Sequence, residues 1–438
     1  MRDLALVIVF FSLVPLAVKH TWIAVNLWTW LSVMNPHRLA WGFAYSMPFA
    51  MMAALAAFIS LPLNRDRLRF PTDAAVVFLL MFIAWTCVTT AFAFYPGDSF
   101  EQLKKVVKIQ VMTLVALAAV RERKHIEWFI WINALSIGFY GFKGGLFTIL
   151  SGGGSRVWGP PGGFIEGNNE IGLAMVMVIP LLNYLRLVSH SPWVRAALVV
   201  GMLLTAAAVL GTQSRGALLA IVAMAAVLWW RSQKKLGGLA VLVVVAASLL
   251  AFMPESWTER MNTIGAYQDD SSAMGRINAW LMAYNLANDR PLGGGYEVIT
   301  HELFSRYAPD PTDLHAAHSI YFQVLGEHGW FGLLLFMGIG FFAFRDAARV
   351  RKQAQHRVES QWLVHLCGML QVSMVGFAVG GAFLSLAYFD LPYNIMVMVV
   401  ACRWWLKEER WKLETTGAFG SAAPVARLKP QDQALKAA

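Results

Sequence analysis

Residues 74–94 read AAVVFLLMFIAWTCVTTAFAF, an apolar run without a charged residue. A helix needs about 20 mostly apolar residues to cross the hydrocarbon core of a bilayer, so this run predicts a membrane span. The whole chain is similar in character, because 58% of its 438 residues are hydrophobic and only 14% are charged. Soluble domains have about 25% charged residues. The sequence therefore predicts an all-α, polytopic membrane protein.

Comparable apolar stretches recur along the whole chain. They cover residues 4–18, 21–34, 40–62, 74–94, 106–120, 126–150, 169–185, 194–211, 214–230, 236–253, 319–344, 362–387 and 389–402. The first two are short and are separated by Pro15, Lys19 and His20, so we interpret residues 4–34 as one broken or strongly bent span. This interpretation predicts about twelve spans with both termini in the cytoplasm. Thirteen spans with an extracytoplasmic N-terminus is the alternative.

These stretches divide the chain into four parts. We expect a transmembrane bundle of about ten spans in residues 1–253 and a long periplasmic loop in 254–317. Two or three further apolar helices are expected in 318–405. Residues 406–438 lack an apolar pattern and predict a disordered cytoplasmic tail.

Basic residues gather on every second connection between the apolar stretches. They are Arg65, Arg67 and Arg69; Arg121, Arg123 and Lys124; Arg186 and Arg195; Arg231, Lys234 and Lys235; and Arg345, Arg349, Arg351, Lys352 and Arg357. The positive-inside rule makes these connections cytoplasmic and makes 95–103, 151–168, 211–214 and 254–317 extracytoplasmic. A net charge of +10 is also typical of proteins that bind nucleic acid. Because the basic residues are spread between spans and not gathered on one folded face, we expect no nucleic-acid partner.

The loop of residues 254–317 is the one sizeable polar region, and a connection of this length is usually functional or disordered. Apolar residues recur in it at mostly helical spacing, at Ile277, Trp280, Leu281, Tyr284 and Leu286. Ser271 and Ser272 precede them as possible caps, and Pro291 with the glycines at 293–295 stops the helix. The pattern predicts a helix near 273–287, on or close to the membrane surface.

His318 lies where this loop returns to an apolar stretch, in the sequence AHSIYFQVLGEHGW of residues 317–330. Its unperturbed pKa of about 6.5 suits a general base that takes a proton from a hydroxyl group. Two other interpretations stay open. His318 could cap the helix that re-enters the membrane, or bind a metal with Asp313 and His315, although the spacing matches no strong zinc pattern. Glu327 and His328 lie further along and would hydrogen-bond between helices or orient the site.

Arg215 begins an apolar stretch on the extracytoplasmic side, against the positive-inside trend. Its side chain could extend to the lipid headgroups. Alternatively, its planar guanidinium could grip a diphosphate through two hydrogen bonds, with Gly211 and Gly216 letting a phosphate approach the backbone. Arg276, in the first turn of the predicted surface helix, is either a solvated charge or part of the same site as Arg215 and His318.

Other polar residues on this side are candidates for substrate binding. Lys104, Lys105 and Lys108 lie at the outer end of a span, where they could recruit an anionic substrate or bind acidic headgroups. Asn168 and Asn169 begin another span and either cap its helix or line the cavity. The glycine-rich residues 151–163 lack the Gly-Lys-Ser/Thr ending of a phosphate loop, so we expect no nucleotide partner.

Three segments together resemble the O-antigen ligase and polymerase superfamily of bacterial inner-membrane proteins. They are Thr212-Gln213-Ser214-Arg215-Gly216-Ala217; Gly275-Arg276 with Trp280, followed by Pro291-Leu292-Gly293-Gly294-Gly295; and His318-Ser319 with Tyr321, Leu325, Glu327, Gly329 and Gly332. The resemblance covers roughly residues 165–345. The segments at 159–164 and 168–170 are also similar to O-glycosylation ligases associated with exosortase systems. Ser319 stands where many relatives have Asn.

The resemblance implies a GT-C-like glycosyltransferase of the bacterial inner membrane, with its active site facing the periplasm. It implies an undecaprenyl-diphosphate-linked glycan as donor, a sugar hydroxyl of lipid A-core as acceptor, and an inverting reaction without metal or other cofactor. In this chain, His318 would be the base, and Arg215 and Arg276 would stabilise the leaving diphosphate. Ser319 and Tyr321 join the lysines and asparagines named above as substrate-binding candidates, and membrane lipids surround the spans.

Three alternatives remain at this point. The acceptor could be another lipid-linked repeat unit, which would make the protein an O-antigen polymerase, or it could be a protein. A transporter of lipid-linked sugars would use the two arginines to bind diphosphate and His318 to carry protons. The lack of a clear internal repeat argues against the transporter.

Overall fold

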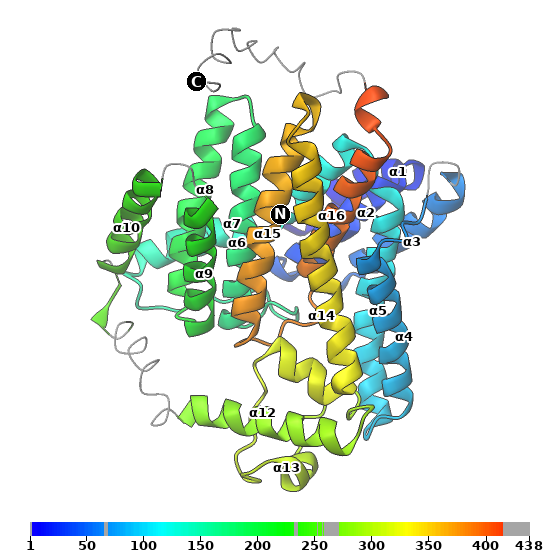
Figure 1. Cartoon of the computed structure of the whole chain (residues 1–438), viewed down its shortest axis with the longest axis vertical. Helices are drawn as coiled ribbons and strands as arrows, with labels where there is room; N and C mark the ends of the chain where they lie inside the picture. Colours follow the sequence, from blue (N-terminus) through cyan, green and yellow to red (C-terminus); the bar gives the residue numbers. More distant parts are fainter. Residues whose placement is uncertain are drawn as a thin grey trace, which may run out of the picture.

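A computed structural model describes residues 2–64, 69–231, 235–251, 253–255, 257 and 271–414 (Figure 1). All regular structure within these residues is helical, which confirms the predicted all-α class. Arg65, Arg67, Lys234, residues 258–270 of the long loop and residues 415–438 of the predicted tail lie outside this described part.

The longer helices form a bundle with two further helices at one end (Figure 1). Their bounds are α1 (Arg2–Lys19), α2 (Thr21–Met34), α3 (Phe49–Leu63), α4 (Ala74–Ala91), α5 (Pro96–Ala119), α6 (Arg123–Leu150), α7 (Asn168–Val188), α8 (Pro192–Gly211), α9 (Arg215–Arg231), α10 (Lys235–Ala251), α12 (Ser271–Asp289), α13 (His301–Tyr307), α14 (Ile320–Ala354), α15 (Gln361–Gly381) and α16 (Asp390–Lys407). Short 3-10 helices are η1 (Pro36–Leu39), η2 (Phe43–Ser46), η5 (Val358–Ser360) and η6 (Arg410–Lys412).

Helix α7 forms the centre of the bundle and packs against α6, α8, α9 and α15. Its side chains are buried all round between Ile171 and Val178, as expected for a helix surrounded by other helices. Gly376 and Gly380 let α15 approach closely, since a Cβ atom at Gly380 would come within 2.6 Å of Leu173 on α7. Small residues at such contacts replace the hydrophobic driving force that helices in lipid lack.

Five helical segments of the described chain are long and apolar enough to cross a membrane: α4, α7, α8, α14 and the segment Val358–Gly381. Helix α3 is apolar but shorter. Some other predicted spans are helical yet fall below this length or apolarity, because α9 and α10 have 17 residues each and α5 carries three lysines. The structure thus supports a membrane-embedded protein, and the number of twelve spans stays a prediction.

The first two helices meet at the predicted break, where His20 separates α1 from α2. A carboxylate oxygen of Asp3 accepts hydrogen bonds from the backbone N–H groups of Gly42 and Ala44, both at 3.1 Å. The start of α1 therefore lies beside the segment that follows α2. Residues 4–34 form a helical hairpin in place of one bent span, which favours counting the two apolar stretches separately.

Part of the predicted tail is ordered. Helix α16 continues to Lys407, and the indole N–H of Trp405 donates a hydrogen bond of 3.0 Å to Glu414. Arg410 lies 3.5 Å from Glu122, which ties η6 to the turn between α5 and α6. These contacts between distant parts of the chain leave no periodic signal in the sequence.

Helices α12 and α13 lie below the bundle in Figure 1, with α12 running crosswise to the membrane helices. The stretch 273–287 lies within α12, and the buried side chains of Ala279, Met282 and Leu286 pack against α13 and its surroundings. The apolar spacing in residues 273–287 thus corresponds to a small hydrophobic core, separate from the core of the bundle, that α12 forms with α13.

Helix α14 is kinked at Gly329, whose φ of 68° is in the left-handed region that favours glycine. The segment 293–295 docks at this kink. Gly294 N donates to Gly326 O and Gly295 N to Glu327 O, both at 2.9 Å. A Cβ atom at Gly293, which has a φ of 69°, would lie 2.6 Å from Gly329 N. The glycines that stop α12 therefore also lock the long loop onto α14.

We expect Gly293→Ala to destabilise the protein by on the order of 1–3 kcal/mol, because the alanine meets both an unfavourable φ and a backbone clash. Thermal unfolding of the purified protein in detergent measures the effect as a lower Tm. Gly201→Ala on α8 is the matched control, since a Cβ atom there meets nothing within 4 Å. Equal unfolding temperatures for the two variants would contradict the tight docking.

Candidate functional site

Arg215 is the first residue of α9, at the end of the bundle next to α12. Ser214 caps the helix, because its hydroxyl oxygen accepts a hydrogen bond of 3.2 Å from Ala217 N. The preceding turn is held by Asn168, whose amide group donates to Thr212 O at 2.8 Å. The starts of α7 and α9 are therefore joined. These hydrogen bonds fix the backbone from which the Arg215 side chain extends.

The glycine-rich loop lies along the same turn. Val157 N donates to Gly211 O at 3.0 Å, and the guanidinium of Arg156 donates to the side-chain oxygen of Gln213 at 3.2 Å. Arg156 thus brings a further positive charge close to Arg215. Arg156 was not predicted as a site residue, because nothing in its local sequence pattern indicates that this loop folds back onto the α8–α9 turn.

His318 precedes α14 and has a strained backbone, with a φ of 41°. The cap of α14 is Ser319, which makes no side-chain capping hydrogen bond. The interpretation of His318 as a helix cap is therefore wrong. Its Nδ1 atom is buried and has no hydrogen-bond partner among the residues that the structure describes. A residue with a strained backbone and a buried ring nitrogen without a hydrogen-bond partner is typical of functional sites.

The surroundings of His318 keep its imidazole neutral. Burial, followed by the positive charge of Arg276 and the neighbouring His315, lowers the pKa of His318 to about 4. A neutral imidazole has an unprotonated nitrogen that accepts a proton. Because the charge of Arg276 acts on the His318 ring, the two residues lie near each other.

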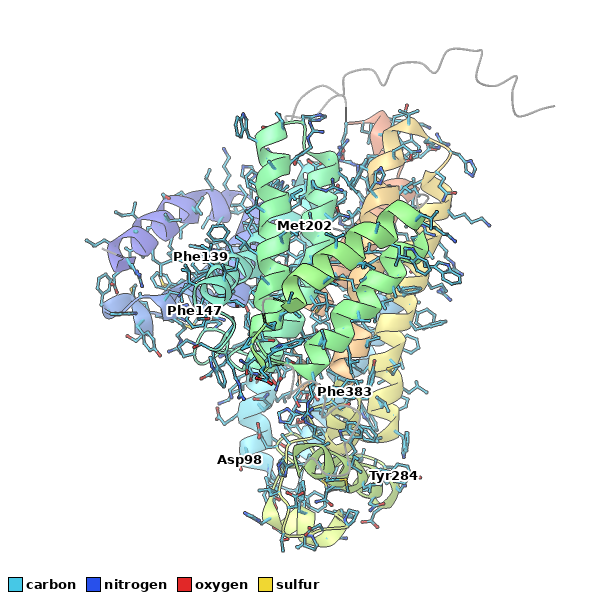
Figure 2. All side chains as sticks on the ribbon, turned by 90° about the vertical axis from the view of Figure 1, so that its left-hand side faces the viewer. Asp98, Phe139, Phe147, Met202, Tyr284 and Phe383 are labelled. Carbon is cyan, nitrogen blue, oxygen red and sulfur yellow. The ribbon has the colours of Figure 1, made fainter. Side chains whose placement is uncertain are left out.

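A chain of aromatic contacts joins this pair to the start of α9. The indole N–H of Trp280, one turn after Arg276, donates a hydrogen bond of 2.6 Å to the carbonyl of Ala317. The Trp280 ring lies 6.5 Å from that of Phe383, whose Cβ would be 3.1 Å from a Cβ atom at Gly216. Figure 2 shows Phe383 between α12 and the lower ends of the membrane helices. Arg215, Arg276 and His318 therefore lie at the same end of the bundle.

A second imidazole lies beside His318. His315 Nδ1 is 2.6 Å from a carboxylate oxygen of Asp313, and a Cβ atom at Gly275 would clash with the His315 ring. The glycine before Arg276 therefore makes room for this Asp–His pair. In the part of the chain that the structure covers, no three His, Cys, Asp or Glu side chains group as metal ligands would.

The start of α7 adds polar groups to this end of the bundle, but Asn168 and Asn169 do not cap the helix. The cap of α7 is Gly167 and no side chain caps it, so a capping role for Asn168 or Asn169 is wrong. Asn168 binds the α8–α9 turn instead. The next residue but one, Glu170, interacts electrostatically with Arg276. Only the tertiary fold brings this carboxylate to an arginine a hundred positions away.

Lys104, Lys105 and Lys108 are exposed on α5. Lys104 pairs with Glu101 at 2.5 Å and lies over the ring of Phe100, 5.2 Å from its centroid. These contacts are within the lysine's own helix. Within the described residues, no hydrogen bond or ion pair joins the three lysines to His318, so a role in substrate binding stays a prediction.

An apolar cavity of about 310 Å³ begins directly beyond His318, between α14, α15 and α16. It is lined by Ile320 and Tyr321 and by side chains further along the helices, among them Phe336, Met337, Phe341, Met374, Phe377 and Met396. The Tyr321 hydroxyl donates to Ala378 O at 2.7 Å, so its ring is fixed as a wall of the cavity. Ser319 is buried beside it, and its hydroxyl has no partner among the described residues.

His328 makes the predicted contact between helices, and Glu327 bonds to the segment between α15 and α16. The Tyr388 hydroxyl, in the segment before α16, donates to Glu327, and His328 Nδ1 is 2.7 Å from the Thr89 hydroxyl on α4. The two side chains belong to the last turn before the Gly329 kink. They hold the short helix 320–328 in place and so orient the residues that precede it.

Comparison with known families identifies this region. Residues 200–337, which contain Arg215, Arg276 and His318, match the model described as O-antigen ligase. The match supports the assignment of residues 200–337 to the O-antigen ligase family. The match supports an O-antigen ligase- or polymerase-like glycosyltransferase function in the membrane. Residues 1–190 match a second model, described as a family of unknown function, and no curated protein matches the chain.

Replacement of Arg276 tests the electrostatics of the site. In Arg276→Gln one of the positive charges that lower the pKa of His318 is gone, so we expect this pKa to rise above about 4 and the ring to protonate at a higher pH. An NMR titration of isotopically labelled histidine measures the shift, with His318→Gln to assign the signal. Arg306→Gln, an exposed arginine on α13, is the control. An unchanged titration in Arg276→Gln would mean that the two groups do not interact.

Proposed function

We propose that the protein is an O-antigen ligase that transfers a glycan from undecaprenyl diphosphate to a sugar hydroxyl of lipid A-core in the periplasmic leaflet. The observation that carries the proposal is the location of Arg215, Arg276 and His318 at one end of the bundle, inside the segment that matches the O-antigen ligase family. The reaction needs no nucleotide because the diphosphate already activates the donor.

His318 is the proposed general base. Its neutral ring takes the proton of the acceptor hydroxyl while the hydroxyl oxygen forms a bond to the anomeric carbon of the donor. The bond from that carbon to the diphosphate oxygen breaks in the same step, with inversion, and undecaprenyl diphosphate leaves with its negative charge. The buried, unpartnered Nδ1 of His318 supports this role, and the lowered pKa keeps the ring neutral and able to accept a proton. A positioned base of this kind contributes roughly 10²–10⁴-fold to the rate.

Arg215 and Arg276 are proposed to stabilise the charge that grows on the leaving diphosphate. Guanidinium groups form paired hydrogen bonds with phosphate oxygens, and fixed cations in a site with little water lower the barrier by several kcal/mol. Arg156 lies next to the α8–α9 turn and adds a third cation. Asn169, Ser319 and the lysines of α5 are proposed to bind the sugars of the donor or acceptor.

The apolar cavity beyond Tyr321 suits a polyprenyl chain. Its walls are almost entirely apolar, with flexible Met side chains that adapt to an irregular ligand. A chain in this cavity would place its diphosphate at the start of α14, next to His318. This arrangement favours a lipid-linked donor.

Reconstitution with undecaprenyl-diphosphate glycan, lipid A-core and excess chelator tests the proposed reaction. Wild-type protein should form product without added metal, and His318→Ala should lose activity by at least about 100-fold because it lacks the base. His315→Ala is the matched control, since this second imidazole lies on the same segment. Full activity of His318→Ala with loss in His315→Ala would move the base to the Asp313–His315 pair.

The acceptor distinguishes the ligase from its relatives. If only a second lipid-linked repeat unit accepts the glycan, the protein is a polymerase, and transfer to a protein acceptor would place it with the O-glycosylation ligases. Failure with every acceptor would overturn the glycosyltransferase proposal.

Arg215→Lys tests the diphosphate contact. A lysine keeps the charge but not the planar pair of donors, so we expect at least a tenfold lower kcat/KM. An arginine that only extends to lipid headgroups would tolerate the change. Arg306→Lys, on the exposed face of α13, controls for the loss of an arginine at this end of the molecule.

A further inference from the structure

A second cavity, of about 700 Å³, lies at the opposite ends of α5 and α16 from the site at His318. It lies among the α1–α2 connection, the α5–α6 turn and the end of α16. We call it the basic cavity, defined by Arg69, Arg121, Lys124, His125 and Arg410, with Trp22 and Trp404. By the positive-inside rule this is the face predicted to be cytoplasmic.

Cations outnumber carboxylates in the basic cavity. Arg69, Arg121, Lys124 and Arg410 stand against Glu122 and Glu408, with His20 and His125 as further titratable groups. Glu122 lies 3.5 Å from Arg410 and 3.6 Å from His125, so its charge is already shared. Arg410 also lies 3.5 Å from Glu414. Among the described residues, Arg121 has no carboxylate within 4.0 Å. The cavity therefore keeps an excess of positive charge at Arg121.

Arg121 is only 6% exposed and is held in a fixed orientation. Its Nε donates to Ala118 O at 3.1 Å, and its guanidinium carbon lies 4.6 Å above the Trp404 ring. One of its terminal nitrogens, Nη2, is buried and has no hydrogen-bond partner in the part of the chain that the structure describes. A buried cationic donor without an acceptor is costly, and an anionic oxygen in the cavity would remove that cost.

Burial and the charge of Arg69 lower the pKa of Arg121 to about 10, so the guanidinium remains charged at neutral pH. The ligand chemistry that fits a planar, charged guanidinium beside a lysine is a phosphate ester. The planar guanidinium of Arg121 therefore favours an anion with several oxygen atoms.

The two tryptophans indicate that this phosphate belongs to a lipid. Trp22 stacks on His125, with 4.7 Å between ring centroids, and lies under the Lys124 ammonium group at 5.5 Å. Tryptophans concentrate at the level of the lipid headgroups. Leu16 and Ile23 also line the cavity, so an apolar wall continues from the cationic part toward the hairpin of α1 and α2.

We propose that the basic cavity binds the phosphate of an anionic phospholipid from the cytoplasmic leaflet, with Arg121 as its main donor and Lys124 at the rim. Basic pockets between helices on this side of a membrane are a known way of holding acidic headgroups. The bound lipid bridges α2, the α5–α6 turn and α16. This site is independent of the proposed transferase reaction.

Delipidated protein in detergent, titrated with phosphatidylglycerol or phosphatidylcholine, tests the proposal by thermal unfolding and by native mass spectrometry. Phosphatidylglycerol should raise the Tm by several degrees and remain bound, and phosphatidylcholine should do neither. Arg121→Gln should weaken phosphatidylglycerol binding at least tenfold. Lys352→Gln, an exposed lysine in the last turn of α14, is the matched control and should bind as wild type does.

Three results would overturn the proposal. They are equal binding of the two lipids, unchanged binding in Arg121→Gln, and stabilisation by soluble glycerol 3-phosphate but not by phosphatidylglycerol, which would assign the cavity to a free phosphate ester. If Arg121→Gln fails to fold, Lys124→Gln replaces it, because this exposed side chain lies at the rim and its loss should also weaken binding.

Discussion

The docking of Gly293, Gly294 and Gly295 onto the kink of α14 is the contact on which the arrangement of the site depends. Two backbone hydrogen bonds connect the loop to Gly326 and Glu327, and the close approach requires glycine on both sides. The docked loop holds the end of α12 next to the short helix 320–328. Because Arg276 is on α12 and His318 precedes that short helix, this backbone contact, together with the hydrogen bond from Trp280 to Ala317 O, keeps the two residues at the same end of the molecule.

Around this contact, the polar groups of the candidate site and the apolar cavity lie next to each other but do not mix. Charged and hydrogen-bonding groups lie at the starts of α7, α9 and α14, and the apolar cavity starts one turn away, where Tyr321 is tied to Ala378. An amphiphile with a charged linkage and a long apolar tail fits such a boundary better than a soluble ligand does. Asn168, Trp280 and Tyr321 each donate to a backbone carbonyl, which fixes these side chains at this end.

Apolar periodicity and motif order predicted the helical class and a helix in the loop, because both depend on residues near one another in the sequence. Motif order likewise proposed the ordered set of Arg215, Arg276 and His318, and the structure brings the three to the same end of the bundle. Contacts between distant segments could not be predicted in this way. The fold-back of α1 on α2, the position of Arg156 against Gln213 and the approach of Glu170 to Arg276 all depend on how helices pack. The capping role considered for Asn168 and Asn169 was wrong because Gly167 takes the cap position, and Asn168 bonds to the α8–α9 turn.

The low pKa of His318 also bears on what happens after a proton has been taken up. An imidazolium with a pKa of about 4 is, at pH 7, roughly a thousandfold more likely to be deprotonated than protonated at equilibrium. Under the proposed reaction, the ring would therefore pass its proton on quickly, to water or to the departing diphosphate, and return to the neutral form before the next acceptor arrives. In the proposed reaction, the burial that makes His318 a weak base would thus also let it return to the neutral form without a separate partner.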